Sequence, residues 1–394
     1  MMSEWKEYKL GDLVTFQRGH DLPRTEMIEG IFPVAGSNSI IGFHNKFTTK
    51  SPGITIGRSG NIGNPQLHKT DFWAHNTVLY VKEFKKVDPG YFYYLLKTLD
   101  FTQLNSGSAV PSLNRNFIHP FVVSIPESIK TQTAIAEILS SLDDKIELNN
   151  NINKELENLA QTLFKQYFID FEFPDENGEP YQSSGGEMVE SELGMIPKGW
   201  EVRKLSALIR LTGGGTPKRS SADYWGGNIK WFSIQDIPND SQVFVVDTKE
   251  KITELGLNKS STKLLPRGTT IITARGTVGK LALVAEPMAM NQSCYGVNGA
   301  SGLAEFYTYF NLKNAVEKLR QNVHGAVFDT ITSNTFDAIK SIYGNNNLAN
   351  LFEEIVRPMM EQIENNCREN QELSNLRDTL LPKLIAGELN VKDL

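Results

Sequence analysis

The chain has 394 residues, 40% of them hydrophobic and 22% charged, with a formal net charge of −6. This length and composition predict a globular protein of about two to four domains. No apolar run approaches about 18 residues and no apolar signal segment opens the chain, so we expect a cytoplasmic protein without a membrane span. Cys294 and Cys367 lie far apart, without metal-like spacing to histidine, which predicts inert thiols in a reducing compartment.

Residues 1–127 are predicted to form a globular lobe of short strands and turns, called lobe 1 below. Ile54–Ile56, Val78–Val81 and Phe121–Val123 have strand composition, and clusters of glycine, proline, asparagine and serine separate them. A helix is predicted over Tyr91–Leu99, after an Asp-Pro-Gly turn. Lobe 1 is therefore expected to be a mixed domain of an α+β protein.

Residues 128–172 are predicted to form a long helix with a coiled-coil seam. From Thr131 onward, apolar and amide residues recur at alternating steps of three and four. The seam residues are Ile135, Leu139, Leu142, Ile146, Asn149, Asn153, Leu156, Ala160 and Leu163. Residues 173–197, rich in proline, glycine, glutamate and serine, are predicted to be a linker. An antiparallel pair of helices would need such a return segment.

Residues 198–348 repeat the plan of lobe 1 and are called lobe 2. Trp200–Leu205 matches Trp5–Leu10 at a shift of 195 positions, and Gly276–Gly279 matches Gly60–Gly63 at a shift of 216. Strands are predicted at Thr270–Thr273 and Phe244–Val246, and a helix at about 304–321. About 21 extra residues near 240–263 should give lobe 2 a different shape there. A domain-sized repeat predicts internal pseudo-twofold symmetry, as suits a protein that reads a two-part target.

Residues 349–394 are predicted to form a second long helix, whose seam repeats the first at a shift of 217 positions. Asn149 and Asn153 map onto Asn366 and Asn370, and such amides in a seam fix the register at some cost in stability. The matching seam is Phe352, Val356, Met359, Ile363, Asn366, Asn370, Leu373, Arg377 and Leu380. The alternative is two separate amphipathic helices, each packed on its own lobe.

The charge is unevenly distributed along the chain. Residues 1–127 carry 13 basic and 11 acidic side chains, and residues 198–343 carry 18 and 12. The helical and linker segments are acidic, with 4 basic and 14 acidic side chains in 128–197 and 5 and 9 in 344–394. A face that attracts phosphate can therefore exist on an acidic protein. For lobe 1, where the excess is only +2, ordinary fluctuation is an equal alternative.

Sequence motifs for catalysis are missing. Gly279-Lys280 is followed by Leu281, so no phosphate-binding loop is formed, and neither a His-Glu-x-x-His nor a Gly-x-Ser-x-Gly motif occurs. The Asn-Pro-Pro-aromatic signature of amino-methylating enzymes is also missing, and the six histidines show no paired arrangement. We expect no catalysis by this chain alone, no cofactor and no metal.

Polar loops of the two lobes are the candidate nucleic-acid contacts. An arginine lies beside each Gly-x-x-Gly turn, Arg58 in lobe 1 and Arg275 in lobe 2. Arginine and lysine can reach phosphates or guanine edges, whereas asparagine and glutamine pair with adenine. The candidates are Arg58, Ser59, Asn61, Asn76, Arg115, Thr216, Lys218, Arg219, Arg275, Thr277, Asn291 and Gln292. The alternative is that the glycines only make tight turns; Trp5, Trp200 and Trp231 are expected to fill cores.

Over essentially its full length the chain resembles the specificity subunits of type I restriction-modification systems. The matching segments are Trp5–Leu10, Gly194–Trp200, Gly213–Pro217 with Ile229–Trp231, Phe171–Pro174 through Val189, and Leu376–Leu384 followed by Gly387–Leu389. In place of the Gly-Gly-Thr-Pro text, lobe 1 has Gly19-His-Asp-Leu-Pro23, so the correspondence there is looser.

The resemblance implies two target recognition domains held apart by an antiparallel pair of long helices, and recognition of double-stranded DNA in two parts separated by a gap. It also implies that the helices dock two modification subunits, which carry the S-adenosylmethionine and the chemistry, and that restriction subunits join them. A coiled-coil scaffold without a nucleic-acid role is the alternative, and an enzyme with an unseen site is a third. A DNA-recognition protein can be told from a scaffold by salt, because binding to phosphates weakens steeply as the salt concentration rises.

Overall fold

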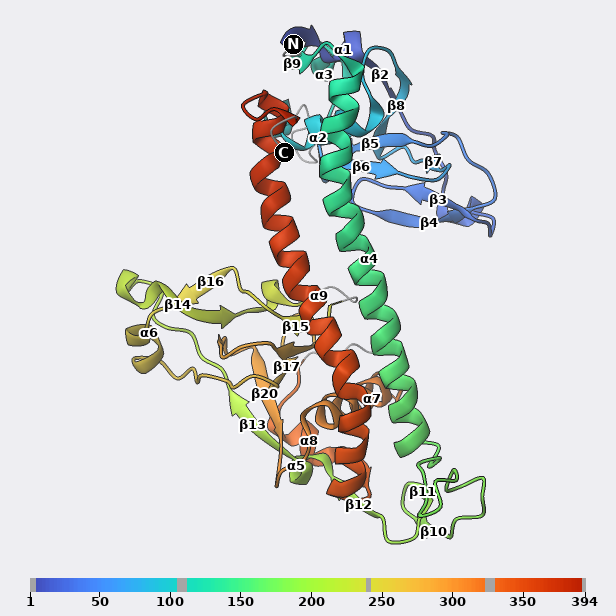
Figure 1. The fold of residues 1–394 in the computed structure, drawn as a ribbon, viewed down its shortest axis with the longest axis vertical. Coiled ribbons are helices and arrows are strands. Elements are labelled where there is room, and N and C mark those ends of the chain that lie inside the picture. Colours follow the sequence, from blue (N-terminus) through green and yellow to red (C-terminus); the bar gives the residue numbers. More distant parts are fainter. Residues whose placement is uncertain (1–4, 105–111, 239–241, 323–329, 392–394) are drawn as a thin grey trace. The chain divides into compact units, whose positions relative to one another are not determined.

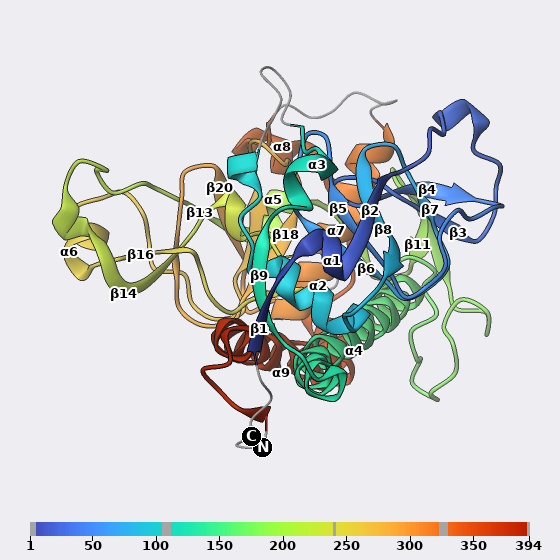
Figure 2. The ribbon, with the colours of Figure 1, turned by 90° about the horizontal axis from the view of Figure 1, so that it is seen from above.

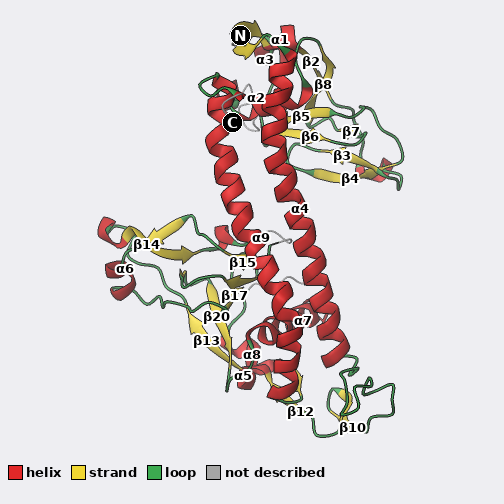
Figure 3. Cartoon of the chain, viewed as in Figure 1, coloured by secondary structure: helices red, strands yellow, loops and turns green. Residues whose placement is uncertain are grey.

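The computed structural model describes residues 5–104, 112–238, 242–322 and 330–391. The chain divides into two compact units, residues 1–145 with 372–394, and residues 146–371. The first unit contains lobe 1 and the second contains lobe 2 (Figure 1). Each unit also holds one part of each long helix. All helices are drawn in red in Figure 3.

Lobe 1 is built on an antiparallel four-stranded sheet in the order β2-β8-β5-β6. Its strands are β2 (Val14–Arg18), β5 (Gly53–Gly57), β6 (Pro65–His68) and β8 (Val78–Phe84). A second sheet, in the order β4-β3-β7, contains β3 (Phe32–Ala35), β4 (Ile40–His44) and β7 (Trp73–Ala74), and β1 (Trp5–Lys9) pairs with β9 (Val122–Pro126). The strands predicted at Ile54–Ile56 and Val78–Val81 are confirmed. The third begins one residue late, because the N–H of Phe121 closes a turn onto the carbonyl of Ile118.

The helices of lobe 1 are short. They are α1 (Leu10–Leu13), η1 (Arg24–Glu26), α2 (Pro89–Lys97), η2 (Thr102–Leu104) and α3 (Arg115–Ile118). Helix α2 begins two residues before its predicted start, since the Asp88 side chain caps it by accepting the N–H of Tyr91 at 2.9 Å and Pro89 suits the first helical position. Its buried face, including Phe92 and Leu96, packs in the core of the first unit.

Lobe 2 contains a five-stranded sheet in the order β13-β20-β17-β18-β15. Its strands are β13 (Ile209–Gly213), β15 (Phe244–Val245), β17 (Thr270–Thr273), β18 (Leu281–Val284) and β20 (Cys294–Gly299). The smaller sheet β16-β14-β19 contains β14 (Trp225–Phe232), β16 (Glu250–Ile252) and β19 (Ala289–Met290), and β12 (Glu201–Lys204) pairs with β21 (Lys340–Tyr343). The strands predicted in β15 and β17 are confirmed.

The remaining elements of lobe 2 are helical. They are α5 (Leu205–Leu208), η3 (Ala222–Tyr224), η4 (Ile234–Asp236), α6 (Glu254–Asn258), α7 (Glu305–Asn322) and α8 (Ser333–Ala338). The stretch predicted to carry extra residues contains, in its described part, β15, β16 and α6; of these, β15 adds a strand to the edge of the main sheet, which has four strands in lobe 1 and five in lobe 2. Before lobe 2, β10 (Met188–Ser191) and β11 (Gly194–Pro197) form a hairpin.

The two long helices, α4 (Ile129–Phe168) and α9 (Asn346–Ala386), lie side by side in both views (Figures 1 and 2). In the second unit the amide of Asn149 donates to Asn370 at 2.9 Å and that of Asn366 donates to Asn153 at 2.8 Å. The helices are therefore antiparallel, because the later residue of α4 pairs with the earlier residue of α9. The shift of 217 positions converts one of these contacts into the other. The alternative of two unpaired helices is therefore wrong.

The buried face of each helix is wider than the predicted seam. In the second unit Phe164 of α4 and Met360 of α9 lie in one core with Phe310 of α7. In the first unit Leu139 of α4 and Leu384 of α9 share a core with lobe 1. Each helix segment thus packs against both the other helix and a lobe, and on α9 adjoining pairs such as Asn366 with Cys367 and Leu384 with Ile385 are buried.

Candidate nucleic-acid interface

In lobe 1 the candidate site is organised by the turn that joins β5 to β6. Gly60 and Gly63 have φ values of +83° and +76°, which side chains rarely adopt. The N–H of Gly63 donates to the carbonyl of Gly57 at 2.9 Å and closes the turn. Arg58 lies between the end of β5 and this turn, half-buried, with its Nη1 donating to the carbonyl of Asn76 at 3.2 Å.

Lobe 2 forms the same turn between β17 and β18. Gly276 and Gly279 have φ values of +77° and +78°, and the N–H of Gly279 donates to the carbonyl of Thr273 at 2.8 Å. Arg275 and Thr277 are exposed on this turn. The two turns therefore present their side chains on the same backbone frame.

Backbone hydrogen bonds show which residues of the two lobes are equivalent. The N–H of Arg58 donates to the carbonyl of Thr77 at 2.8 Å, and in lobe 2 the N–H of Ala274 donates to that of Ser293, also at 2.8 Å. The counterpart of Arg58 is thus Ala274, and the counterpart of Ser59 is Arg275. The two arginines singled out from the sequence occupy neighbouring positions on the frame, not the same position.

A second loop, which follows β2 in lobe 1 and β13 in lobe 2, completes each site. A Cβ on Gly19 would lie 2.1 Å from the carbonyl oxygen of His75, and a Cβ on Gly214 would lie 1.8 Å from that of Asn291. Only glycine fits either place. Gly19 and Gly214 are therefore equivalent, although the sequence around them differs, and the loose correspondence in lobe 1 becomes a defined one.

In lobe 1 this loop brings Asp21 to Asn76. The Asn76 amide nitrogen donates to Asp21, and Nη2 of Arg18 contacts the same carboxylate at 3.0 Å. The pKa of Asp21 is lowered, chiefly by the hydrogen bond from Asn76. Sequence reasoning missed Arg18 and Asp21. The shift of 195 positions, which places Asp21 opposite Thr216, was a signal for Asp21, whereas Arg18 falls opposite Gly213 and had none.

Three arginines of lobe 1 line a pocket of about 410 Å³. They are Arg18, Arg58 and Arg115, and Arg115 begins α3. The bridge between Ser59 and Ser112 lies beside Arg58. Asn61, in contrast, turns its backbone carbonyl toward Gly57, where an added Cβ would lie 1.7 Å from that oxygen. The pocket concentrates positive charge where loops of lobe 1 meet.

In lobe 2 the equivalent loop brings Thr216 to Gln292. The hydroxyl of Thr216 donates to the side-chain oxygen of Gln292. Asn291 is engaged locally, since its side-chain oxygen accepts the N–H of Ser293 at 3.0 Å. The buried Trp231 donates from Nε1 to the carbonyl of Gly215 at 3.0 Å and supports the loop from beneath, so the prediction that it fills a core is confirmed.

The adjacent Arg219 is held within lobe 2. Its guanidinium bonds both carboxylate oxygens of Glu250 and lies 3.8 Å from the ring centroid of Trp225. The hydrogen bond from Arg219 lowers the pKa of the Glu250 carboxyl. Lys218 is exposed, and its carbonyl accepts a hydrogen bond from Nε1 of Trp225 at 3.4 Å. Arg219 thus clamps the smaller sheet to the loop, while Lys218 faces solvent.

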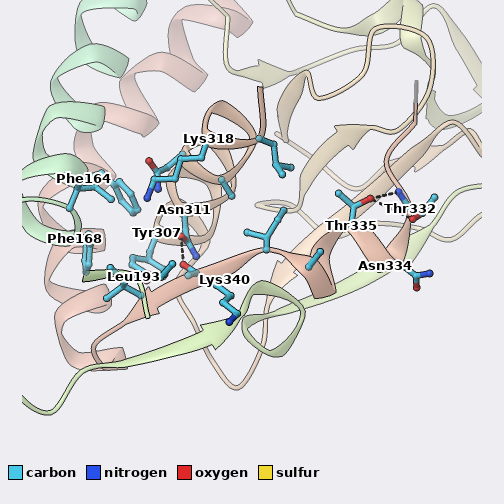
Figure 4. Close-up of a pocket in the computed structure, with 18 residues that line it drawn as sticks. Phe164, Phe168, Leu193, Tyr307, Asn311, Lys318, Thr332, Asn334, Thr335 and Lys340 are labelled. Carbon is cyan, nitrogen blue, oxygen red and sulfur yellow. Dashed lines mark hydrogen bonds between the residues drawn. The ribbon is translucent and has the colours of Figure 1, made fainter. Parts of the chain in front are cut away.

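Another pocket of lobe 2, of about 690 Å³, contains none of the predicted contacts (Figure 4). Tyr307 and Asn311 of α7 line it together with Phe164 of α4, and the side-chain oxygen of Asn311 accepts a hydrogen bond from the hydroxyl of Ser341 at 2.9 Å.

Among the described residues no three histidine, cysteine, aspartate or glutamate side chains are placed to hold a metal ion. No helix in the described ranges is long and apolar enough to cross a bilayer.

Comparison with known proteins identifies the family. The model for the type I restriction modification DNA specificity domain matches residues 2–158 and 197–342. The HindI specificity subunit of Haemophilus influenzae is 26% identical over 98% of this chain and 100% of its own length. The MjaIX specificity subunit of Methanocaldococcus jannaschii is 27% identical over 48% of this chain and 44% of its own.

The fold has a solved counterpart. The S subunit of a type I restriction-modification system from M. genitalium matches with a TM-score of 0.61 at 16% identity, over 97% of this chain and 96% of that one. The scaffold alternative is not supported. The chain belongs to the type I restriction-modification specificity family, and its role is recognition of a DNA sequence.

Proposed function

We propose that this chain reads a DNA target in two parts, with lobe 1 contacting one half-site and lobe 2 the other, and that it contributes no catalysis of its own. One observation carries the proposal: both lobes build the same loop frame and place different side chains on it. Asp21, Asn76 and Arg58 occupy the frame in lobe 1, where lobe 2 has Thr216, Gln292 and Ala274. Equal frames with unequal side chains suit two half-sites of different sequence.

Arginine and lysine side chains on these frames would supply the contacts to phosphate and to base edges. Arg58, Ser59, Asn61, Asn76 and Arg115 are the contacts proposed for lobe 1. In lobe 2 they are Thr216, Lys218, Arg275, Thr277, Asn291 and Gln292, and Arg219 is assigned to holding the loop. The basic excess of residues 198–343, with 18 basic and 12 acidic side chains, favours binding to the DNA backbone.

The long helices are proposed to dock two modification subunits, which bring S-adenosylmethionine, and restriction subunits join that complex. Apolar side chains lie exposed on both helices at positions related by the repeat. Leu159 of α4 is 48% exposed, and Leu376 of α9, 217 positions later, is 47% exposed. Together with the acidic surroundings of these helices, the matching pair supports two equivalent protein contacts.

The first test separates recognition from catalysis. The purified chain, incubated with labelled S-adenosylmethionine and genomic DNA, should transfer no methyl group, whereas the chain assembled with its modification subunit should methylate a two-part sequence. Methylation mapping of strains with and without the gene would identify that sequence. Methyl transfer by the chain alone, or a methylated motif without a gap, would contradict the proposal.

A further inference from the structure

We infer that Asn76 and Gln292 each read one base pair, one in each half-site, and that Asp21 and Thr216 position them. This rests on the proposed two-part recognition and goes beyond it, because it names the residue that distinguishes the lobes. The two pairs occupy equivalent positions in the two lobes. The N–H of His20 donates to the carbonyl of Ala74 at 2.7 Å, and that of Gly215 to the carbonyl of Met290 at 2.9 Å.

These backbone bonds fix the register on both sides of the side-chain pair. His20 precedes Asp21 as Gly215 precedes Thr216, and Ala74 lies two residues before Asn76 as Met290 does before Gln292. Each lobe therefore holds a carboxamide at one position and its hydrogen-bond partner at the other. The two pairs differ in the partner, a carboxylate or a hydroxyl, in one methylene of the amide side chain, and in the amide atom that faces the partner, which is the nitrogen of Asn76 and the oxygen of Gln292.

In lobe 1 the partner fixes the orientation of the amide. A carboxylate only accepts hydrogen bonds, so the nitrogen of Asn76, not its oxygen, must face Asp21. The Asn76 oxygen and the second N–H remain free to act together, as one acceptor beside one donor. That pattern matches N6 and N7 of adenine in the major groove.

Two arginines hold the pair of Asp21 and Asn76, one by contacting Asp21 and the other by contacting Asn76. Arg18 contacts the Asp21 carboxylate at 3.0 and 3.4 Å, and Arg58 donates to the backbone carbonyl of Asn76 at 3.2 Å. The side chains of Arg18 and Asp21 are 52% and 70% exposed, so a duplex can reach this group. A hydrogen bond this open to water adds little to folding, so positioning of the amide is the role that remains.

In lobe 2 the partner leaves more freedom. A hydroxyl can donate or accept, so Thr216 holds Gln292 in place without imposing one orientation of its amide. Gly213 occupies in lobe 2 the position that Arg18 occupies in lobe 1. The arginine that contacts Asp21 therefore has no counterpart in lobe 2 at this position. Exposed Gln292 is therefore expected to read its base pair with less discrimination than Asn76.

The experiment uses the chain assembled with its modification subunit and a pool of duplexes with random sequence, from which bound molecules are selected and sequenced. Asn76→Ala should lower discrimination at one base pair of one half-site by roughly 5- to 150-fold, the range for a bidentate contact, and leave the other half-site unchanged. Gln292→Ala should do the same, by less, in the opposite half-site. Asn177→Ala, an exposed amide of the linker, is the matched control.

Asp21 is tested as a positioning residue. Asp21→Ala should weaken discrimination at the same base pair as Asn76→Ala, with an unchanged melting temperature, and Asp21→Asn, which keeps an acceptor oxygen, should restore part of it. The inference is overturned if Asn76→Ala and Gln292→Ala act on the same half-site, or weaken binding to all sequences alike. Failure of the parent complex to select any two-part sequence would instead refute the proposed function.

Discussion

At the scale of single residues, His68 makes the stability of lobe 1 depend on pH. Its ring stacks on Phe72 with centroids 4.0 Å apart, and Nε2 lies 3.0 Å from the hydroxyl of Thr55. Burial lowers the pKa of His68 from 6.5 to about 4. Between those values the unfolded chain takes up a proton that the folded chain does not. The folded state therefore loses stability as pH falls from about 6.5 to about 4, by roughly 3 kcal/mol in total.

Urea unfolding followed across this pH range would check the assignment. His68→Gln should show a pH dependence smaller than that of the parent by about that amount. Thr55→Val removes the hydroxyl but leaves the burial, so it should lower stability at every pH and keep the parent's slope. A His68→Gln variant with the full slope of the parent would rule His68 out as its source.

Residue type alone predicted part of the candidate site. Asn76 and Gln292 could be chosen from the sequence because amides suit base edges, and the structure places both beside partners at equivalent positions. Asp21 could not be chosen by residue type, since an acidic residue argues against DNA contact until its hydrogen bond to Asn76 is seen; only its place opposite Thr216 in the repeat pointed to it. Arg219 was chosen for its charge, which Glu250 neutralises in the fold.

At the scale of elements, the amide pairs of α4 and α9 set the register of the helices. Asn153→Leu alone leaves the amide of Asn366 without its partner across the seam and should cost about 1 to 3 kcal/mol. The double change Asn153→Leu with Asn366→Leu removes both polar groups, so it should recover most of that loss or exceed the parent's stability. Unfolding by urea of the parent, both single variants and the double variant measures the coupling. Losses that simply add would show that the pair does not act as a unit.

The periodicity of the sequence predicted these helices because the apolar residues of a helix recur every three or four positions, whichever element the helix packs against. It did not predict the width of the buried face. Met360 and Cys367 lie beside the predicted seam positions Met359 and Asn366, and they are buried because lobe 2 covers them. A heptad pattern describes contact with one helix, whereas packing against a sheet and a helix together leaves no simple period.

At the scale of the whole molecule, the helices are proposed to set the gap between the half-sites. Helix α4 has 40 residues and α9 has 41, about 60 Å at roughly 1.5 Å per residue. Duplicating residues 149–155 and 366–372 adds one heptad to each helix, keeps the seam in phase and repeats the amide pairs. The added length, about 10 Å, equals about 3 base pairs.

The variant, assembled with its modification subunit, should keep both half-site sequences but prefer a gap about 3 base pairs wider, with lower affinity because the half-sites also rotate about the duplex axis. Selection from duplexes with fixed half-sites and gaps of every length would measure the preference. Seven residues inserted after Gly178, in the linker, form the matched control, because they lengthen the chain without lengthening either helix. An unchanged gap at full activity in the helix variant, or an equal shift in the linker variant, would mean that spacing is set elsewhere.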